Sequence, residues 1–93
     1  MIFIVESGST KSDWILLQEN STVEYSTMGY NPCFHSTLEI INSLKSHKEI
    51  SDVSEDITKV FFYGAGCSSK KMNQVVENAL ESIFKNAKVT VDH

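Results

Sequence analysis

The sequence has no long apolar run and no basic leader segment. Its uninterrupted apolar runs are only a few residues long, far below the roughly 18 that a membrane span requires. The opening residues, M-I-F-I-V-E, contain no basic residue and reach a glutamate too soon for a secretory signal peptide. These absences argue against a membrane partner and lead us to expect a cytoplasmic protein.

The sequence also has fewer basic than acidic residues. Eight Lys and Arg residues stand against twelve Asp and Glu, which gives a formal net charge of -4. Nucleic acids and anionic membranes attract surfaces with an excess of positive charge, so this balance argues against both partners. The 93 residues, 41% apolar and 22% charged, have the length and composition of one globular domain.

Cysteine and histidine are too sparse to form a site. Cys33 and Cys67 lie far apart and form no C-x-x-C pair, so free thiols are expected. The histidines are too scattered for a metal-binding pair at helical spacing; they are His35, His47 and His93. Nothing in these two residue types predicts a disulfide or a metal centre.

Hydrophobic patterning predicts an alternation of strands and helices. Apolar or alternating segments predict strands at residues 2–5, 14–17, 23–28, 60–63 and 89–91. Short polar turns join the first three strands, so these are expected to be antiparallel. A capping box at Ser36 and Glu39 predicts a helix over 37–47, and an apolar stripe from Met72 to Phe84 predicts another.

These elements predict an α/β fold with one mixed five-stranded sheet. Their order is strand, strand, strand, helix, strand, helix, strand, and right-handed crossovers would place the helices over the sheet. The continuous apolar run at 2–5 is typical of a central strand buried on both faces. The polar residues 48–58 predict an irregular connection. Trp14 is expected to be a packing residue.

The stretch from 6 to 13, E-S-G-S-T-K-S-D, is the most informative part of the chain. Its small and hydroxylated residues would present backbone N–H groups on one concave side of a tight turn, which suits phosphate oxygens. Gly8 would let the backbone approach a ligand, and Lys11 would add positive charge. Glu6, at the end of a central strand, could hold a hydrated Mg²⁺.

Loop 6–13 is not a P-loop, because Lys11 follows Gly8 too closely and a strand comes next. An ordinary hairpin turn is the simpler interpretation. However, a second small-residue segment, G-A-G at 64–66, also follows a predicted strand. Ligands in open α/β sheets gather at the carboxyl ends of strands, so two such loops favour a ligand site.

Three segments together resemble the BadF/BadG/BcrA/BcrD-type ATPases, a group that includes N-acetylglucosamine kinases. Residues 5–14, V-E-S-G-S-T-K-S-D-W, are similar to the first phosphate motif, usually written D-G-G-S-T-K-T-D-W. Residues 28–32, M-G-Y-N-P, resemble the G-x-N-P turn, and residues 62–67, F-Y-G-A-G-C, resemble the Y-G-A-G-C loop. The three motifs occur in the family's order and extend over most of the chain.

The resemblance implies the actin-like ATPase and sugar kinase superfamily. There, two lobes with ribonuclease-H-like sheets close over ATP, Mg²⁺ and a sugar or other acceptor, and residues 1–93 correspond to the N-terminal lobe, without the second lobe. Carried over position by position, the resemblance implies that the ATP phosphates are bound by Gly8, Ser9, Thr10 and Lys11, and that Mg²⁺ is held through water by Glu6. It also implies that the substrate is bound by Asn31, Gly64 and Gly66, and that the catalytic base is Asp92 at the chain end.

Two positions depart from the family's pattern, since Glu6 replaces an Asp and Ser7 replaces a Gly. These departures favour the alternative of a stand-alone binding domain that has lost catalysis. Because one lobe supplies only one side of a phosphoryl-transfer site, we expect the chain alone to be inactive as a kinase. The surface that a second lobe would cover also predicts self-association.

A ribonuclease-H-like nuclease is the third function class. Such a site needs several acidic residues at converging strand ends to hold two metal ions. The strand that leads to Gly64 ends in G-A-G without a carboxylate, and the acidic composition disfavours a nucleic-acid substrate. This class is therefore the least favoured of the three.

Overall fold

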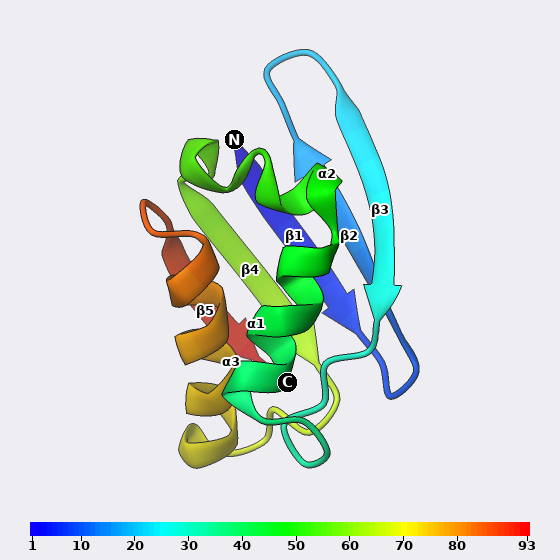
Figure 1. Ribbon diagram of the computed structural model, residues 1–93, viewed down its shortest axis with the longest axis vertical. Coiled ribbons are helices and arrows are strands. Elements are labelled where there is room, and N and C mark those ends of the chain that lie inside the picture. The colour runs from blue at the N-terminus through cyan, green and yellow to red at the C-terminus, as the bar shows by residue number, and fades with distance from the viewer.

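The computed structural model describes all of residues 1–93 and is built on one sheet (Figure 1). The strands are β1 Ile2–Ser7, β2 Lys11–Leu17, β3 Thr22–Met28, β4 Lys59–Gly64 and β5 Lys88–Asp92. They lie side by side in the order β3-β2-β1-β4-β5. β1 pairs antiparallel with β2, which pairs antiparallel with β3, whereas β1, β4 and β5 run parallel.

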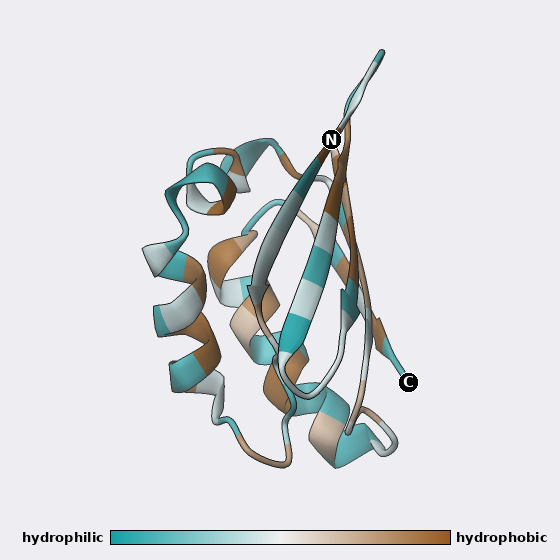
Figure 2. Cartoon of the chain, turned by 90° about the vertical axis from the view of Figure 1, so that its right-hand side faces the viewer, coloured by the Kyte–Doolittle hydropathy of each residue, from teal (hydrophilic) through white to brown (hydrophobic).

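Two helices, α1 Thr37–Ser46 and α3 Lys70–Ile83, cover one face of the sheet (Figure 2). The crossover through α1 and the crossover through α3 both run toward the β5 edge. Right-handed crossovers that run in one direction place their helices on the same face. The predicted α/β fold, with a mixed five-stranded sheet in that element order, is confirmed.

The expectation that the first strand is buried on both faces was wrong. Phe3 and Val5 point toward the helices and are fully buried, but Ile2 and Ile4 point to the other face and stay partly exposed. The reason is that both helices lie on the same face of the sheet, so nothing covers the opposite face of this central strand.

The prediction of an irregular connection over 48–58 was also wrong. The structure has a short helix, α2 Lys48–Ser51, and a 3-10 turn, η1 Ser54–Asp56. Ile50 and Ile57 are fully buried in this segment. Two anchoring side chains in a polar stretch do not make a helical stripe, so periodicity alone does not reveal these turns.

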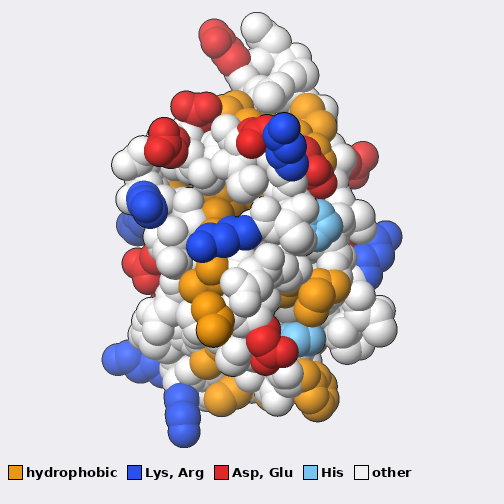
Figure 3. All heavy atoms as spheres, in the orientation of Figure 1, with side chains coloured by type: hydrophobic (Ala, Val, Ile, Leu, Met, Phe, Trp, Pro, Cys, Tyr) orange, Lys and Arg blue, Asp and Glu red, His pale blue; other side chains and the backbone are white.

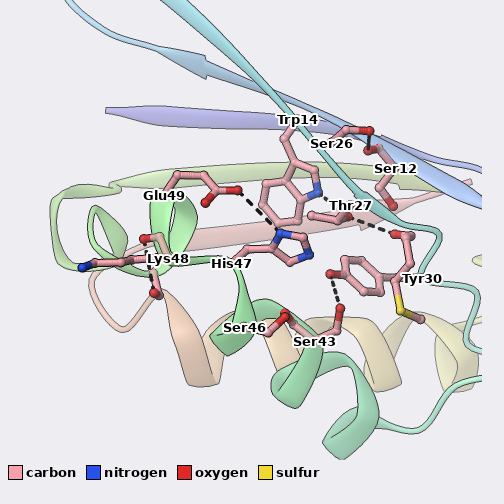
Figure 4. Close-up of polar contacts among 12 residues, drawn as sticks. Ser12, Trp14, Ser26, Thr27, Tyr30, Ser43, Ser46, His47, Lys48 and Glu49 are labelled. Carbon is pink, nitrogen blue, oxygen red and sulfur yellow. Dashed lines mark hydrogen bonds and ion pairs between the residues drawn. The ribbon is translucent and has the colours of Figure 1, made fainter.

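The core lies between the sheet and the helices. Trp14 is fully buried, and its ring packs edge-on against Phe3 at a centroid distance of 5.1 Å, as predicted for a packing residue. The indole Nε1 donates to Thr27 Oγ1 at 3.0 Å, which satisfies the polar atom inside the core (Figure 4). Tyr30 is buried too, and its hydroxyl is hydrogen-bonded to Ser43 Oγ of α1 at 2.8 Å (Figure 4).

The start of α1 forms the capping box that the sequence predicts. Ser36 Oγ accepts from the Glu39 backbone N–H at 3.2 Å, and a Glu39 carboxylate oxygen accepts from the Ser36 backbone N–H at 2.9 Å. The hydrogen bond from the Ser36 backbone N–H favours the ionised carboxylate and lowers the pKa of Glu39, and the Ser36 hydroxyl adds to this shift. None of the helices combines the length and the apolar character that a membrane-spanning segment needs.

Candidate functional site

The candidate site is an open hollow where β1 and β4 end side by side. These strands are parallel neighbours, so the loops that follow them, 8–10 and 65–69, lie at the same edge of the sheet. The hollow has a volume of about 630 Å³. Its lining residues are Glu6, Ser7, Gly8, Thr10, Lys11, Asp13, Tyr63, Gly64, Ala65 and His93.

Loop 8–10 makes a tight turn with free donors. The Gly8 N–H donates to the Lys11 carbonyl at 2.8 Å, which closes the hairpin between β1 and β2. The backbone N–H groups of Ser9 and Thr10 have no partner within the chain. Free amide donors beside a lysine are suited to bind a phosphate or another oxyanion.

Gly29 packs directly against the backbone of this turn. A Cβ atom at Gly29 would collide with the Gly8 carbonyl oxygen and would lie 2.8 Å from the Ser9 carbonyl carbon and 2.9 Å from the Thr10 nitrogen. Only a residue without a side chain allows the chain after β3 to pass this close. The 28–32 segment therefore holds loop 8–10 in position by direct backbone packing.

Ser7 links four segments of the site. Its buried Oγ accepts from the Tyr30 backbone N–H at 2.8 Å and from Ser12 Oγ at 2.7 Å, and its carbonyl accepts from the Ala65 N–H at 2.9 Å. The hydroxyl thus joins the ends of β1 and β2 to the 28–32 segment. Sequence reasoning treated Ser7 only as a departure from a motif, and no local pattern revealed these long-range partners.

The 64–66 loop contacts Asn31 closely. Gly66 has a φ of 83°, which favours glycine, and a Cβ there would collide with Asn31 Oδ1. Asn31 Oδ1 accepts from the Cys33 backbone N–H at 2.8 Å, while the Asn31 amide nitrogen has no hydrogen-bond partner. Asn31 and Gly66 lie next to each other, but neither lines the hollow, whereas Gly64 does.

Two carboxylates face each other at the edge of the hollow. Glu6 of β1 lies opposite Asp13 of β2 in the sheet register, and both line the hollow. Lys11 Nζ lies 3.2 Å from Asp13 Oδ1, and both side chains are more than half exposed, so this pair adds little to stability. Sequence analysis gave Asp13 no role in the site, although a turn centred on Ser9 and Thr10 would have placed it opposite Glu6.

The chain forms no cluster of three or more potential metal ligands. Mg²⁺, however, is usually held by one or two carboxylates together with water and substrate phosphates. Glu6 and Asp13 match that donor set, and the free N–H groups of Ser9 and Thr10 match the phosphates. The residues of the hollow therefore fit a hydrated Mg²⁺ with a phosphate ligand.

Asp92 lies beside the hollow and not in it. It pairs with Tyr63 in the sheet register, and it lines a separate polar hollow of about 400 Å³ at the start of α3. The side chain of His93, which sequence reasoning did not select, borders both hollows. Cys67, which also lines the second hollow, is buried, and burial raises the pKa of its thiol to about 11, with Cys33 and Asp92 adding to the shift.

A scan of protein-family models finds no match to this chain, and a search of curated proteins finds none either. Among solved structures, the chain is similar to a Porphyromonas gingivalis protein provisionally described as an N-acetylglucosamine kinase, with a TM-score of 0.86 and 32% sequence identity. The match covers 99% of this chain but 34% of that protein, so the chain spans about a third of its length. The chain has the fold of one lobe of a kinase-like protein of the actin-like ATPase type.

Proposed function

We propose that this chain is the N-terminal, phosphate-binding lobe of an ATP-dependent kinase that phosphorylates a sugar related to N-acetylglucosamine. The observation that carries the proposal is the hollow at the ends of β1 and β4, in a chain 32% identical to a protein provisionally described as such a kinase. Fold similarity alone would not support an activity, because one fold serves many functions. The chemistry of loop 8–10 supplies the second support.

In this proposal loop 8–10 binds the ATP phosphates. The free N–H groups of Ser9 and Thr10 donate to phosphate oxygens, and Lys11 adds a positive charge at the rim. Gly29 and Ser7 keep these donors in place before the ligand arrives. Such preorganisation lowers the cost of ordering the loop upon binding.

Glu6 and Asp13 would hold Mg²⁺ through water in the same hollow. When bound, the metal ion neutralises charge on the phosphates. The methylene that distinguishes Glu6 from an aspartate is compatible with such outer-sphere contact, because a water molecule spans the remaining distance. Asp13 adds a second negative charge to the site.

Fewer residues support the part of the proposal that concerns binding of the sugar acceptor. Asn31 could donate to an acceptor hydroxyl or N-acetyl group through its free amide nitrogen, because Oδ1 is already engaged by Cys33. Gly64 and Gly66 would shape the backbone next to it. Asp92 is the candidate base, and its position at the end of β5 places it at the same edge of the sheet as the phosphate loop.

Titration of the chain with Mg²⁺ and inorganic triphosphate, followed by backbone amide NMR, tests the phosphate site directly. We expect shifts confined to residues 8–11 and 63–65, which weaken in Lys11→Gln and in Glu6→Gln. Lys45→Gln, on α1, is the matched control and should leave the titration unchanged. Shifts spread evenly over the surface lysines, or no shift at saturating triphosphate, would contradict the proposal.

The chain alone should not transfer phosphate to N-acetylglucosamine. In-line transfer requires charge neutralisation from both sides of the nucleotide, and one lobe supplies one side. A radiolabelled ATP assay with the purified chain checks this expectation. Robust product formation would contradict it.

A non-catalytic binding domain is the second candidate. The observation that favours it is that the Ser7 hydroxyl is committed to Tyr30 and Ser12, so this position serves structure. The triphosphate titration separates the two candidates. Binding of the polyphosphate supports the kinase lobe, and its absence in a folded chain supports the binding domain.

A further inference from the structure

Tyr63 is the aromatic side chain that lines the candidate hollow. It is 43% exposed, whereas its neighbours in β4, Phe62 and Gly64, are buried. Of the three tyrosines, only Tyr30 has its hydroxyl hydrogen-bonded within the chain. The Tyr63 side chain therefore offers a ligand both an apolar ring and a free hydroxyl, which suits a molecule that is itself partly apolar and partly polar.

The sheet register places Tyr63 between two residues of the proposed reaction. Tyr63 pairs with Glu6 of β1 on one side and with Asp92 of β5 on the other. Paired residues of neighbouring strands share one face of the sheet, and neighbouring strands lie about 4.8 Å apart. The three residues therefore form one row, roughly 10 Å long, at the carboxyl ends of three parallel strands, with the aromatic side chain in the middle.

This row lies on the face of the sheet opposite the helices. Figure 2 shows α1 and α3 on one side of the sheet and no element on the other side. Figure 3 shows the helix-covered side, where acidic and basic side chains are interspersed. Tyr63 points away from that side, since it alternates along β4 with the core residues Val60 and Phe62. No helix of the chain covers the row, so a ligand can reach Tyr63 from the open side.

The position of the acceptor hydroxyl rests on the proposed function, in which Glu6 lies on the phosphate side and Asp92 is the candidate base. A hydroxyl that receives a phosphoryl group must lie between the phosphate and the base that takes its proton. In the row of three residues, Tyr63 is the one between those two positions. The acceptor must therefore lie over Tyr63.

We propose that Tyr63 is the platform for the sugar acceptor, and that one face of the pyranose ring stacks on the tyrosine ring. The C–H groups on the face of a pyranose are apolar and slightly positive, whereas the face of an aromatic ring is slightly negative. Stacking removes both apolar surfaces from water. It leaves the sugar hydroxyls, which project from the rim of the pyranose, free for polar partners.

The loop that follows Tyr63 leads to the other proposed sugar contact. Gly64 and Ala65 line the hollow, and Gly66 lies directly against Asn31, whose amide nitrogen is free. Tyr63 and Asn31 are therefore found at the two ends of loop 64–66. One sugar can meet the aromatic ring with its apolar face and the amide with a polar substituent.

Aromatic side chains also stack well on nucleobases. In a nucleotide, however, the ribose and the other phosphates separate the base from the phosphoryl group that is transferred. Tyr63 lies directly beside Glu6 in the register, next to the phosphate side of the hollow. This placement favours the acceptor over the nucleobase as the molecule that stacks on Tyr63.

Isotope-filtered NOE spectra of the labelled chain with unlabelled N-acetylglucosamine test the proposal. We expect NOEs from the Tyr63 ring protons to the C–H protons on one face of the sugar, and upfield shifts of those sugar protons, because they lie over an aromatic ring. Tyr63→Leu should remove both signals and weaken sugar binding roughly three- to tenfold. Tyr63→Phe keeps the ring and should retain both signals. Sorbitol, which has hydroxyls but no ring face, should give no NOE.

The matched control is Phe61→Leu, which removes an aromatic ring from the same face of β4 but away from the hollow. This variant should bind the sugar like the unaltered chain. The proposal is overturned if the sugar gives no NOE to Tyr63, if Tyr63→Leu binds the sugar as well as Phe61→Leu does, or if adenosine contacts the ring and the sugar does not. Triphosphate binding without a contact between Tyr63 and the sugar would reject this inference alone and leave the proposed phosphate-binding function standing.

Discussion

Single residues beneath loop 8–10 fix its geometry more than the loop's own residues do. Gly29 leaves no space for a Cβ atom against the loop backbone, and the Ser7 hydroxyl ties the loop to Tyr30. Both interactions join parts of the chain that lie about twenty positions apart. The site therefore depends on residues that need not touch a ligand.

Gly29→Ala should destabilise the chain by about 1 to 3 kcal/mol, because the new methyl group overlaps the backbone of Gly8 to Thr10. Urea denaturation followed by tryptophan fluorescence measures the change. Gly8→Ala is the control, since a Cβ there meets only the Lys11 carbonyl oxygen at an ordinary 3.5 Å. Equal midpoints for the two variants would contradict the role given to Gly29.

The two cysteines should differ sharply in reactivity. Cys33 is exposed, whereas burial raises the pKa of Cys67 to about 11, so its reactive thiolate is scarce at pH 8. Iodoacetamide should label Cys33 first in the folded chain and both thiols equally in urea, as read by peptide mass spectrometry. Equal labelling of the folded chain would show that Cys67 is accessible.

The same shift predicts a loss of stability at alkaline pH. The folded chain holds the Cys67 proton more tightly than the unfolded chain does, because burial disfavours the thiolate. The free energy of unfolding should therefore fall as the pH rises from the ordinary thiol range toward about 11. Cys67→Ala should flatten this part of the pH profile, and an unchanged slope would assign the loss to other groups.

At the scale of elements, the hydrogen bonds that cap the first turns of the helices contribute measurably to the stability of the fold. α1 begins with a reciprocal capping box, in which Ser36 and Glu39 each satisfy the other's backbone N–H. α3 begins with Ser69, whose hydroxyl accepts from the Met72 N–H at 3.2 Å. These caps set where the helices start and hence where the preceding loops reach the site.

Ser36→Ala should cost about 1 kcal/mol of stability, because the Glu39 backbone N–H loses its side-chain acceptor. The part of the effect that comes from the Ser36 hydroxyl acting on the Glu39 carboxylate should disappear as the pH falls through the lowered pKa of Glu39. Urea denaturation at neutral and acidic pH measures both. Ser46→Ala, at the other end of α1, is the control and should change little.

Elements that depend on near neighbours were predictable from the sequence. The capping box and the apolar stripe of α3 are patterns within a few residues, so their positions followed directly. The uncovered face of β1 and the buried Ile50 depend on where distant elements pack, and local patterns do not contain that information. For the same reason segment 6–13 was selected as a candidate site from its own residues, although Asp13 was given no role in it, while His93, which only the folded sheet brings to the hollow, was not selected.

At the scale of the whole molecule, the sheet order predicts a gradient of local stability. β1 has hydrogen-bonded neighbours on both sides, whereas β3 and β5 form the edges. Amides of β1 should therefore exchange with solvent most slowly and the outward amides of β3 among the fastest. Hydrogen-exchange NMR on a dilute, monomeric sample measures the gradient, and equal protection of β3 and β1 would show that the edge is covered.

The two ends of the chain offer different handles for experiments. The terminal amine donates to the Asp56 carbonyl at 3.1 Å and the Met1 carbonyl accepts from the Thr58 N–H at 2.8 Å, at the end of β1 remote from loop 8–10. His93 borders the candidate hollow. Immobilisation through an N-terminal tag should therefore leave the hollow open to solution, whereas a fluorophore attached after His93 would report directly on its occupancy.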